Sequence, residues 1–441
     1  MTVTTAQEQI AELAKRYPER GLTSLNKYLD EEWLRAAYRR IRKDGATGID
    51  GVSAREYGKD LDKRLTELVN CAKSGSYRAP AVRRTYIEKP GKRDEKRPLG
   101  IPTTEDKVLQ KAVVMLIEPI YEAEFYDFSY GFRPGRSCHR AIDALRDAVM
   151  GGRIGWILEA DIRKFFDRLS HSHLREIVRQ RVRDGVLTRL IDKWLKAGVL
   201  EAGEWTRTEE GTPQGGVISP LLANIYLHEV LDKWFAKEIQ PRLKGRCFLI
   251  RYADDFVMGF EREDDARRVL EVLPKRVARF GLELHPEKTR IVPFRRPDRW
   301  EKQRDKEQSQ SFNFLGFTHF WRRSRKGNWV VGEKTAKDRL NRSLIVINQW
   351  CRENRHEPLK EQQKTLNQKL QGHYAYFGVT GNIRCLQRYW RGVRRYWHRW
   401  LRRRTKWDSS LNWDWYERTI AANYPLLMPR VVHSVYARAN P

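Results

Sequence analysis

Three aspartates follow apolar, strand-like segments at two distant places in the chain. Asp161 ends one apolar run, and Asp254 and Asp255 lie between two others, at 247–253 and 256–260. The second pattern predicts a β-hairpin with two acids at its tip. Adjacent aspartates also occur in tight turns for a local reason, because their side chains bond their own backbone. The hairpin alone therefore leaves a catalytic and a purely local interpretation open.

The position of Asp161 favours the catalytic interpretation. The residues before it are almost all apolar, so its carboxylate lies at the margin of a core, where uncompensated like charges are costly. A shared divalent cation resolves such repulsion, and hard oxygen ligands suit magnesium, for which manganese substitutes. Two such ions activate an attacking 3′-hydroxyl and stabilise a leaving pyrophosphate. We therefore predict that Asp161, Asp254 and Asp255 converge as catalytic, metal-binding residues for two magnesium ions.

The charge balance predicts a polyanionic partner. Lys and Arg number 86 against 57 Asp and Glu, which gives a formal net charge of +29 and a pI near 10.0. Nucleic acid is the leading candidate. An anionic membrane surface is disfavoured, because no apolar run approaches the length of a membrane span. The N-terminus lacks an apolar signal core, and the five cysteines show no zinc-ligand spacing, so we expect a cytoplasmic protein.

The elements that would position the aspartates are mixed in order, which favours an α+β fold. Residues 8–42 are predicted to be helical, and residues 82–102 to form an extended ribbon with a turn at 89–92. A 3.6-residue apolar period predicts a helix over 104–122. Another helix is expected with Ser219 as N-cap and Pro220 at its first position. From about residue 321 we expect strands to fade and basic helices to take over.

Eight ordered motifs resemble the reverse transcriptase family, and within it the bacterial group II intron-encoded reverse transcriptase/maturases. Besides the Asp161 segment, the motifs are found at 45–51, 97–102, 130–137, 212–227, 252–255, 281–289 and 314–317. The resemblance implies a right-hand polymerase: fingers, a palm with an antiparallel sheet, a helical thumb, and a small basic C-terminal helical domain. It implies an N-terminal extension and fingers at 1–150, a palm with part of the fingers at 151–320, a thumb or maturase domain at 321–395, and a DNA-binding tail at 396–441.

The same resemblance implies a set of nucleotide-binding residues. Lys89 and Arg97 correspond to the fingers cations that hold the triphosphate, although Lys92 could replace Lys89. Phe166 corresponds to the aromatic residue that excludes a 2′-hydroxyl, for which a core aromatic is the alternative. Gln214 corresponds to the glutamine of the nucleotide pocket. The set is completed by Ile162, Arg163 and Lys288, and for Lys288 a solvated surface lysine is an equal alternative.

The resemblance also implies contacts with nucleic acid. Arg133 and Arg136 would lie near the template, with loop solvation as the alternative, and Leu315 and Gly316 would form the primer grip. The basic, aromatic segment 389–404 matches the maturase domain, where Arg394, Arg395 and Arg402 would bind RNA. Its tryptophans and tyrosines fit a core better than a stacking platform.

The predicted function is therefore RNA-directed DNA polymerisation, together with binding and splicing of a parent group II intron RNA. The implied partners are structured intron RNA, an RNA template with a DNA primer, target DNA and deoxynucleoside triphosphates, with monomer or homodimer undecided. A host-adapted reverse transcriptase and a non-catalytic RNA-binding splicing factor remain alternatives. The chain lacks the His-Asn-His nuclease motif of many relatives, so we expect no second-strand cleavage.

Overall fold

The computed structural model describes residues 2–88, 96–197, 199–201, 204–206, 215–297, 310–404 and 410–435. The chain divides into two compact units. The first comprises residues 1–87, 96–148 and 152–291, and the second comprises residues 88–95, 149–151 and 292–441. Each unit combines helices with antiparallel strand pairs, which confirms the α+β prediction.

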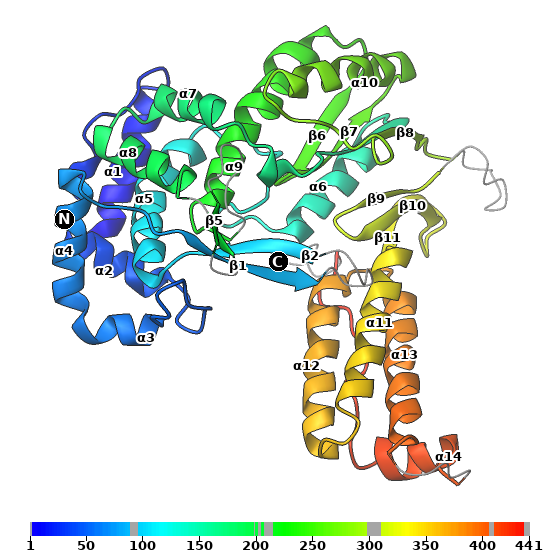
Figure 1. The fold of residues 1–441 in the computed structure, drawn as a ribbon. Helices are drawn as coiled ribbons and strands as arrows, with labels where there is room; N and C mark the ends of the chain where they lie inside the picture. The colour runs from blue at the N-terminus through cyan, green and yellow to red at the C-terminus, as the bar shows by residue number, and fades with distance from the viewer. Residues whose placement is uncertain are drawn as a thin grey trace. The chain divides into compact units, whose positions relative to one another are not determined.

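Helix α5 (Thr104–Glu122) forms the centre of the first unit and has the predicted bounds. The Thr103 side chain accepts a hydrogen bond from the Asp106 amide at 3.2 Å and so caps the first turn. Buried residues lie on all sides of the helix, as expected for a helix surrounded by protein. Helices α1 (Val3–Arg16) and α2 (Glu31–Arg40) pack against it (Figure 1), so the helical prediction for 8–42 resolves into two helices with a break between them.

A four-stranded sheet with the order β6-β7-β3-β8 carries the predicted acidic segments. Strands β6 (Cys247–Tyr252) and β7 (Asp255–Phe260) form the predicted hairpin, and β3 (Trp156–Asp161) pairs antiparallel with β7. The fourth strand is β8 (Arg290–Pro293). The interior residues of β3 are buried, as expected for a strand covered on both faces. Helix α10 (Glu263–Ala278) packs on this sheet (Figure 1).

A second sheet in this unit has the order β2-β1-β4-β5. Strands β1 (Val82–Glu88) and β2 (Lys96–Ile101) confirm the ribbon predicted over 82–102, and its turn at 89–92 lies outside the described residues. The other two strands are β4 (Val199–Glu201) and β5 (Glu204–Thr206). The remaining helices of the unit are α3 (Ala54–Tyr57), α4 (Leu61–Ser74), α6 (Cys138–Gly151), α7 (His171–Arg181), α8 (Gly185–Leu195) and α9 (Ser219–Leu227).

The start of α9 differs by one residue from the prediction. Ile218 is the N-cap, Ser219 is the first helical residue, and no side chain caps the helix. The predicted N-cap role of Ser219 is therefore wrong. The backbone amides of Val217 and Ile218, where the chain enters this helix, donate to the Gln110 side chain. Leu222, Ile225 and Tyr226 of this helix are buried.

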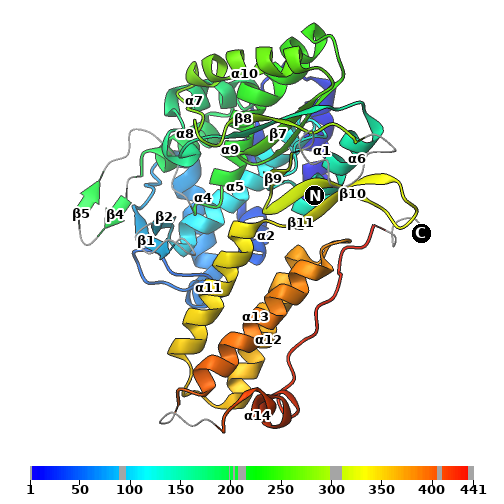
Figure 2. The same cartoon turned by 90° about the vertical axis from the view of Figure 1, so that its right-hand side faces the viewer.

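The second unit combines a three-stranded antiparallel sheet with a helical bundle. The strands β9 (Phe312–Phe314), β10 (Phe317–Arg323) and β11 (Trp329–Thr335) have the order β11-β10-β9. The expectation that strands fade from about residue 321 is wrong, because the β10–β11 hairpin continues to Thr335. Helices α11 (Lys337–Glu353), α12 (Leu359–Phe377) and α13 (Ile383–Leu401) follow and lie side by side, with the short α14 (Trp413–Trp415) near one end (Figures 1 and 2). The expected thumb–tail boundary at 395/396 falls inside α13.

Candidate active site

The three aspartates come together at one end of the sheet that contains β3, β6 and β7. Asp161, the last residue of β3, lies directly opposite Asp255, the first residue of β7. Side chains at directly opposite positions lie on the same face of a sheet, with Cβ atoms about 5 Å apart. Asp254 occupies the two-residue turn that joins β6 to β7. Segments far apart in the chain thus place three carboxylates at one point.

The turn that carries Asp254 has an unusual backbone. Ala253 has a φ of +55° and is 6% exposed. An L-residue rarely adopts this left-handed conformation, so the surrounding protein must hold it. The loop around Gly131 lies against this turn. A Cβ atom on Gly131 would lie 2.3 Å from the Ala253 nitrogen, so only glycine permits the contact.

Arg251 supports the same turn from inside the protein. Its side chain is fully buried and donates to the Ala253 carbonyl at 3.1 Å and to Asn224 Oδ1 at 3.0 Å. It also donates to Ser129 Oγ at 2.7 Å and to both carboxylate oxygens of Asp232. Burial, the largest effect on the Asp232 carboxyl, raises its pKa. The Arg251 charge, the neighbouring His228 side chain and the Arg251 hydrogen bonds together outweigh burial, so this pKa lies below its ordinary value.

Asp161 is the partner of Lys288, another residue of the predicted set. The Lys288 ammonium group donates to the Asp161 carboxylate, whose side chain is 23% exposed. Within the described part of the chain, no three His, Cys, Asp or Glu side chains already form a metal-ligand group. The donor set still fits a divalent cation, because Asp161 and Asp255 occupy directly opposite positions on one strand pair, and carboxylate oxygens are the ligands that magnesium prefers.

Ile162 and Arg163 continue the chain beyond Asp161. The Asp161 carbonyl accepts from the His285 amide at 2.7 Å, and the Arg163 amide donates to the Glu283 carbonyl at 2.8 Å. Because backbone groups alternate in direction along a strand, the Ile162 carbonyl points the other way, toward the β7 side. The Arg163 side chain is about half exposed and lies 3.4 Å from the Glu283 carboxylate.

Phe166 follows in a short 3₁₀ turn, Phe165–Asp167. Its half-buried ring contacts the Phe165 ring at a centroid distance of 5.3 Å, whereas Phe165 itself is 2% exposed. Of the two rings, Phe166 is therefore the one with an accessible edge. Lys164 before it has a φ of +48°, a further rarely adopted conformation close to Asp161.

Most of the residues predicted to contact the triphosphate and the base lie outside the described part of the chain. Lys89, its alternative Lys92, and Gln214 lie outside the described residues, and only the backbone of Arg97 is described, on β2. The glycine after Gln214 is described. Gly215 has a φ of +115°, and a Cβ on it would lie 2.6 Å from the Gly100 carbonyl of β2. The segment after Gln214 therefore lies against the strand that carries Arg97.

The two arginines predicted to contact the template bind the protein itself. Arg133 is buried, pairs with Glu122 at 3.0 Å and donates to the Tyr126 and Ser129 carbonyls. These contacts give Arg133 a bracing role in place of a template contact. Arg136 pairs with the exposed Asp127 at 2.6 Å, and its side chain is 23% exposed.

The predicted primer-grip residues lie in the second unit. Leu315 and Gly316 occupy the turn between β9 and β10, and both have positive φ values, 49° and 79°. The Leu315 carbonyl accepts from the Tyr376 hydroxyl at 2.9 Å. Helix α12, which carries Tyr376, therefore holds this turn in place.

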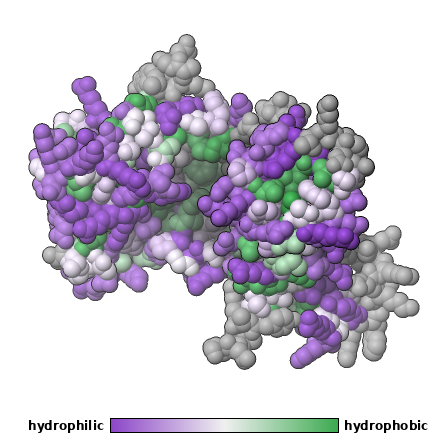
Figure 3. Space-filling view, turned by 90° about the horizontal axis from the view of Figure 1, so that it is seen from below, coloured by the Kyte–Doolittle hydropathy of each residue, from purple (hydrophilic) through white to green (hydrophobic). Residues whose placement is uncertain are grey.

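The basic helix α13 separates into a core face and a surface face. Tyr389 and Trp397 are buried in the bundle, and Trp390, Tyr396 and Trp400 pack against its core, as the sequence predicted. Arg394 pairs with Glu417 and lies 4.5 Å from the Trp390 ring centroid, and Arg402 is half buried. Arg395 is exposed, so of these three arginines it is the most accessible to RNA. The face shown in Figure 3 is largely covered by hydrophilic side chains, in agreement with the charge of +29.

Polar residues inside the protein were missed by the sequence analysis. Asp106 and Gln110 lie on a helix that the apolar period predicts without assigning them a role, yet both are at most 4% exposed. Their spacing of four, which places both residues on one face of the helix, was the available signal. Arg251 and Asp232 were missed because nothing in their local sequence marks them as buried partners.

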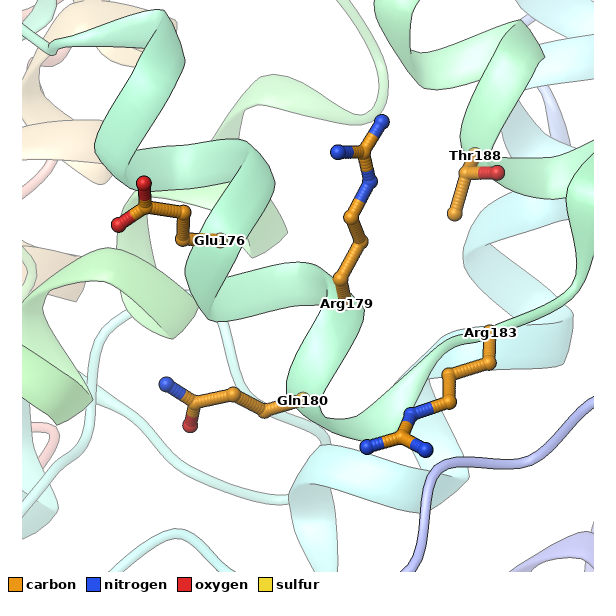
Figure 4. Close-up of a pocket in the computed structure, with 5 residues that line it drawn as sticks. All are labelled: Glu176, Arg179, Gln180, Arg183 and Thr188. Carbon is orange, nitrogen blue, oxygen red and sulfur yellow. The ribbon is translucent and has the colours of Figure 1, made fainter.

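An open pocket of about 520 Å³ lies between α7 and α8 (Figure 4). It is lined by Glu176, Arg179, Gln180, Arg183 and Thr188. None of these residues belongs to the predicted catalytic or nucleotide-binding set. The pocket therefore adds nothing to the aspartate site.

Comparisons with known proteins agree with this geometry. The family model of reverse transcriptases (RNA-dependent DNA polymerases) matches residues 87–319, more than half of the 441-residue chain. The group II intron-encoded protein LtrA of Lactococcus lactis is 34% identical over 280 residues, which cover 61% of this chain and 46% of LtrA. Protein YkfC of Escherichia coli is 33% identical over 373 residues, which cover 75% of this chain and 92% of YkfC.

A third relative is the mitochondrial nuclear intron maturase 2 of Arabidopsis thaliana, 28% identical over 174 residues, or 31% of this chain and 24% of that protein. The chain spans about half the length of LtrA. The family match over residues 87–319 identifies the chain as a member of the reverse transcriptase class. The chain belongs to the reverse transcriptase family and, within it, to the group II intron-encoded reverse transcriptase/maturases. No helix among the described residues has the length and apolar character needed to span a membrane.

Proposed function

We propose that this protein is an RNA-directed DNA polymerase that also binds its parent group II intron RNA, assists its splicing and copies it into DNA. The observation that carries the polymerase proposal is the direct pairing of Asp161 with Asp255, with Asp254 in the adjoining turn. That pairing lies inside the region matched by the reverse transcriptase family. The substrates would be deoxynucleoside triphosphates, an RNA template and a DNA primer.

Asp161, Asp254 and Asp255 would hold two magnesium ions, with the Ile162 carbonyl directed to the same side. When bound, the ions supply charge that activates the primer hydroxyl and stabilises the leaving pyrophosphate. Lys288, which pairs with Asp161, would contact a phosphate oxygen. Arg97, Gln214 and Lys89 would hold the triphosphate and base, and Arg163 would contribute a further cation.

Phe166 would exclude ribonucleotides. Its ring has an accessible edge, and it follows Asp161 by five residues, so a bulky side chain there would clash with a 2′-hydroxyl. The discrimination would be steric: a ribose hydroxyl would overlap the ring.

We further propose the polymerase layout of fingers (1–150), palm (151–320), thumb (321–395) and basic tail (396–441). The antiparallel sheet with the aspartates supports the palm assignment, and the α11–α13 bundle supports the thumb assignment. Exposed cations on α13, including Arg395, would bind the intron RNA. Relatives that are named as intron-encoded proteins and as an intron maturase support this part.

The test of the polymerase proposal is primer extension on an RNA template with magnesium. Asp254→Ala is expected to lower the rate by at least about 10³-fold, because it removes a ligand needed only for chemistry. A matched control is Asp147→Ala, which removes an exposed aspartate on α6 and should retain full activity. Equal activity of Asp254→Ala and the unaltered protein would reject the assignment.

The maturase proposal needs a separate measurement. The group II intron RNA that flanks the coding frame is incubated with the protein, and its splicing rate is followed at a magnesium concentration too low for self-splicing. Asp254→Ala should accelerate splicing as well as the unaltered protein does, because RNA binding does not use the aspartates. A host-adapted enzyme would polymerise DNA and leave splicing unchanged. A non-catalytic splicing factor would do the reverse.

A further inference from the structure

A chain of hydrogen bonds connects helix α5 with the backbone that leads into helix α9. The Tyr77 hydroxyl donates to Asp106 Oδ1 at 2.6 Å, and Gln110 Nε2 donates to Asp106 Oδ2 at 3.0 Å. Gln110 Oε1 then accepts from the Val217 amide at 2.8 Å and from the Ile218 amide at 3.3 Å. The Gln110 amide thus joins a buried carboxylate to two backbone amides.

The side chains that form this chain of hydrogen bonds are buried. Tyr77, Asp106 and Gln110 are each at most 4% exposed, so water cannot easily replace a missing partner. The orientation of the Gln110 amide is also determined. If its oxygen and nitrogen were exchanged, its N–H groups would face the Val217 and Ile218 N–H groups, and its oxygen would face the carboxylate. The Asp106 carboxylate therefore orients the group that holds the backbone.

The backbone that Gln110 holds directly follows Gln214, Gly215 and Gly216. On its other side, Gly215 lies so close to β2 that a Cβ atom would be 2.6 Å from the Gly100 carbonyl. The segment is therefore fixed between β2, which carries Arg97, and α5, which carries Gln110. A shift of Val217 and Ile218 would move Gly215 and Gly216, which directly follow the proposed nucleotide-binding glutamine in the chain.

We infer that Gln110, oriented by Asp106 and Tyr77, is a positioning residue for the deoxynucleotide pocket. This inference rests on the proposed polymerase function and deepens it. In this role Gln110 would not contact the substrate; it fixes the backbone at Val217 and Ile218, three and four residues after Gln214 in the chain.

Stability alone does not account for these polar groups. The neighbouring positions of α5, including Val108, Leu109 and Val113, are fully buried and apolar. Apolar side chains at 106 and 110 would serve helix packing equally well. Burial instead raises the pKa of Asp106 to about 6, which shows that the carboxylate is held in an unfavourable environment. A buried polar network whose members are hydrogen-bonded gives the surrounding backbone a defined geometry.

The inference is tested by steady-state primer extension with Gln110→Met, a side chain of similar length that cannot form these hydrogen bonds. The KM for deoxynucleoside triphosphate is expected to rise about tenfold, because two buried amides are left without an acceptor and the segment shifts. The kcat value and the affinity for primer-template should change less than about twofold. This separation of KM from kcat would not result from a general loss of folded protein.

Two further variants and one control complete the experiment. Asp106→Asn keeps an oxygen that accepts from Gln110 and should hold KM within about twofold of the unaltered value. Gln110→Asn is one methylene group too short to reach the amides and should raise KM, so it replaces Gln110→Met if that variant does not fold. The control Trp33→Phe removes another buried hydrogen bond to α5, from Trp33 Nε1 to the Ala112 carbonyl at 2.9 Å, and should leave KM unchanged.

The possible failures are distinguishable. If the unaltered protein extends no primer, the proposed function fails and this inference fails with it. If the unaltered protein is active but a folded Gln110 variant has the same KM, only the inference is overturned. A rise in KM of similar size in Trp33→Phe would also overturn it, because general loosening of α5 would then explain the effect.

Discussion

Arg251 and Asp232 form an ion pair in which neither side chain is exposed to solvent. Arg251 is the residue two positions before the turn that contains Asp254, and its guanidinium donates to the Ala253 carbonyl inside that turn. The pair therefore connects the β6–β7 hairpin to the helical segment that follows α9.

Removing one partner of this pair should be more damaging than removing both. Arg251→Met removes the fully buried cation that pairs with Asp232 and leaves this carboxylate beside the His228 ring at 3.6 Å, and we expect it to lower the free energy of unfolding by about 3–5 kcal/mol. Arg251→Met combined with Asp232→Leu should recover much of this stability. The double variant should still polymerise slowly, because no side chain would donate to the Ala253 carbonyl. Urea denaturation and primer extension measure both effects, and equal stability of the single and double variants would contradict the prediction.

The buried carboxyl of Asp106 predicts a pH dependence. Burial raises its pKa from 3.8 to about 6, so between these values the folded state binds more protons than the unfolded state. The contribution of Asp106 to stability must therefore fall as the pH rises through this range. Asp106→Asn removes this titration, and its stability relative to the unaltered protein should rise by about 1 kcal/mol between about pH 5 and pH 7. Urea denaturation at the two pH values checks this, and a constant or opposite difference would show that Asp106 is not held in this way.

The sugar selectivity of the enzyme should depend on Phe166. Phe166→Ala is expected to increase incorporation of ribonucleotides relative to deoxynucleotides by about tenfold or more, because it removes the ring that would clash with a 2′-hydroxyl. The neighbouring Phe165 provides the control, since it is 2% exposed. Phe165→Leu should lower stability without altering the ratio. The ratio of kcat/KM for the two nucleotide types is the measurement, and an unchanged ratio in Phe166→Ala would remove the residue from the pocket.

Two adjacent arginines on α13 should behave differently in RNA binding. Arg395 is exposed, and replacing it with alanine should reduce the slope of log K against log salt by about 0.7 for each phosphate of single-stranded RNA that it neutralises. Arg394 pairs with Glu417 and packs against Trp390, so Arg394→Ala should mainly lower the melting temperature. Binding measured over a range of salt concentrations, together with thermal melts, separates the two roles. The opposite pattern would place RNA on the other side of the helix.

The elements that carry the site follow from the order of the residues alone. Alternating and continuous apolar runs predicted β6, β7 and helix α5 close to their final bounds, because these patterns depend on neighbours along the chain. The ordered motifs placed Asp161, Asp254 and Asp255 at strand ends. The family followed from the same motifs, and the family match over residues 87–319 confirms it.

Which residues face one another depends on how the elements pack. The register that sets Asp161 opposite Asp255, the pairing of Asp161 with Lys288, and the burial of Arg133 arise from contacts between distant segments. The residues that neighbour these positions in the sequence do not predict such contacts. The same holds for Gln110, which looks like one more helical residue until α9 brings two backbone amides to it. The role of a polar side chain depends on the group that it contacts in the folded protein, and the packing of the elements decides which group that is.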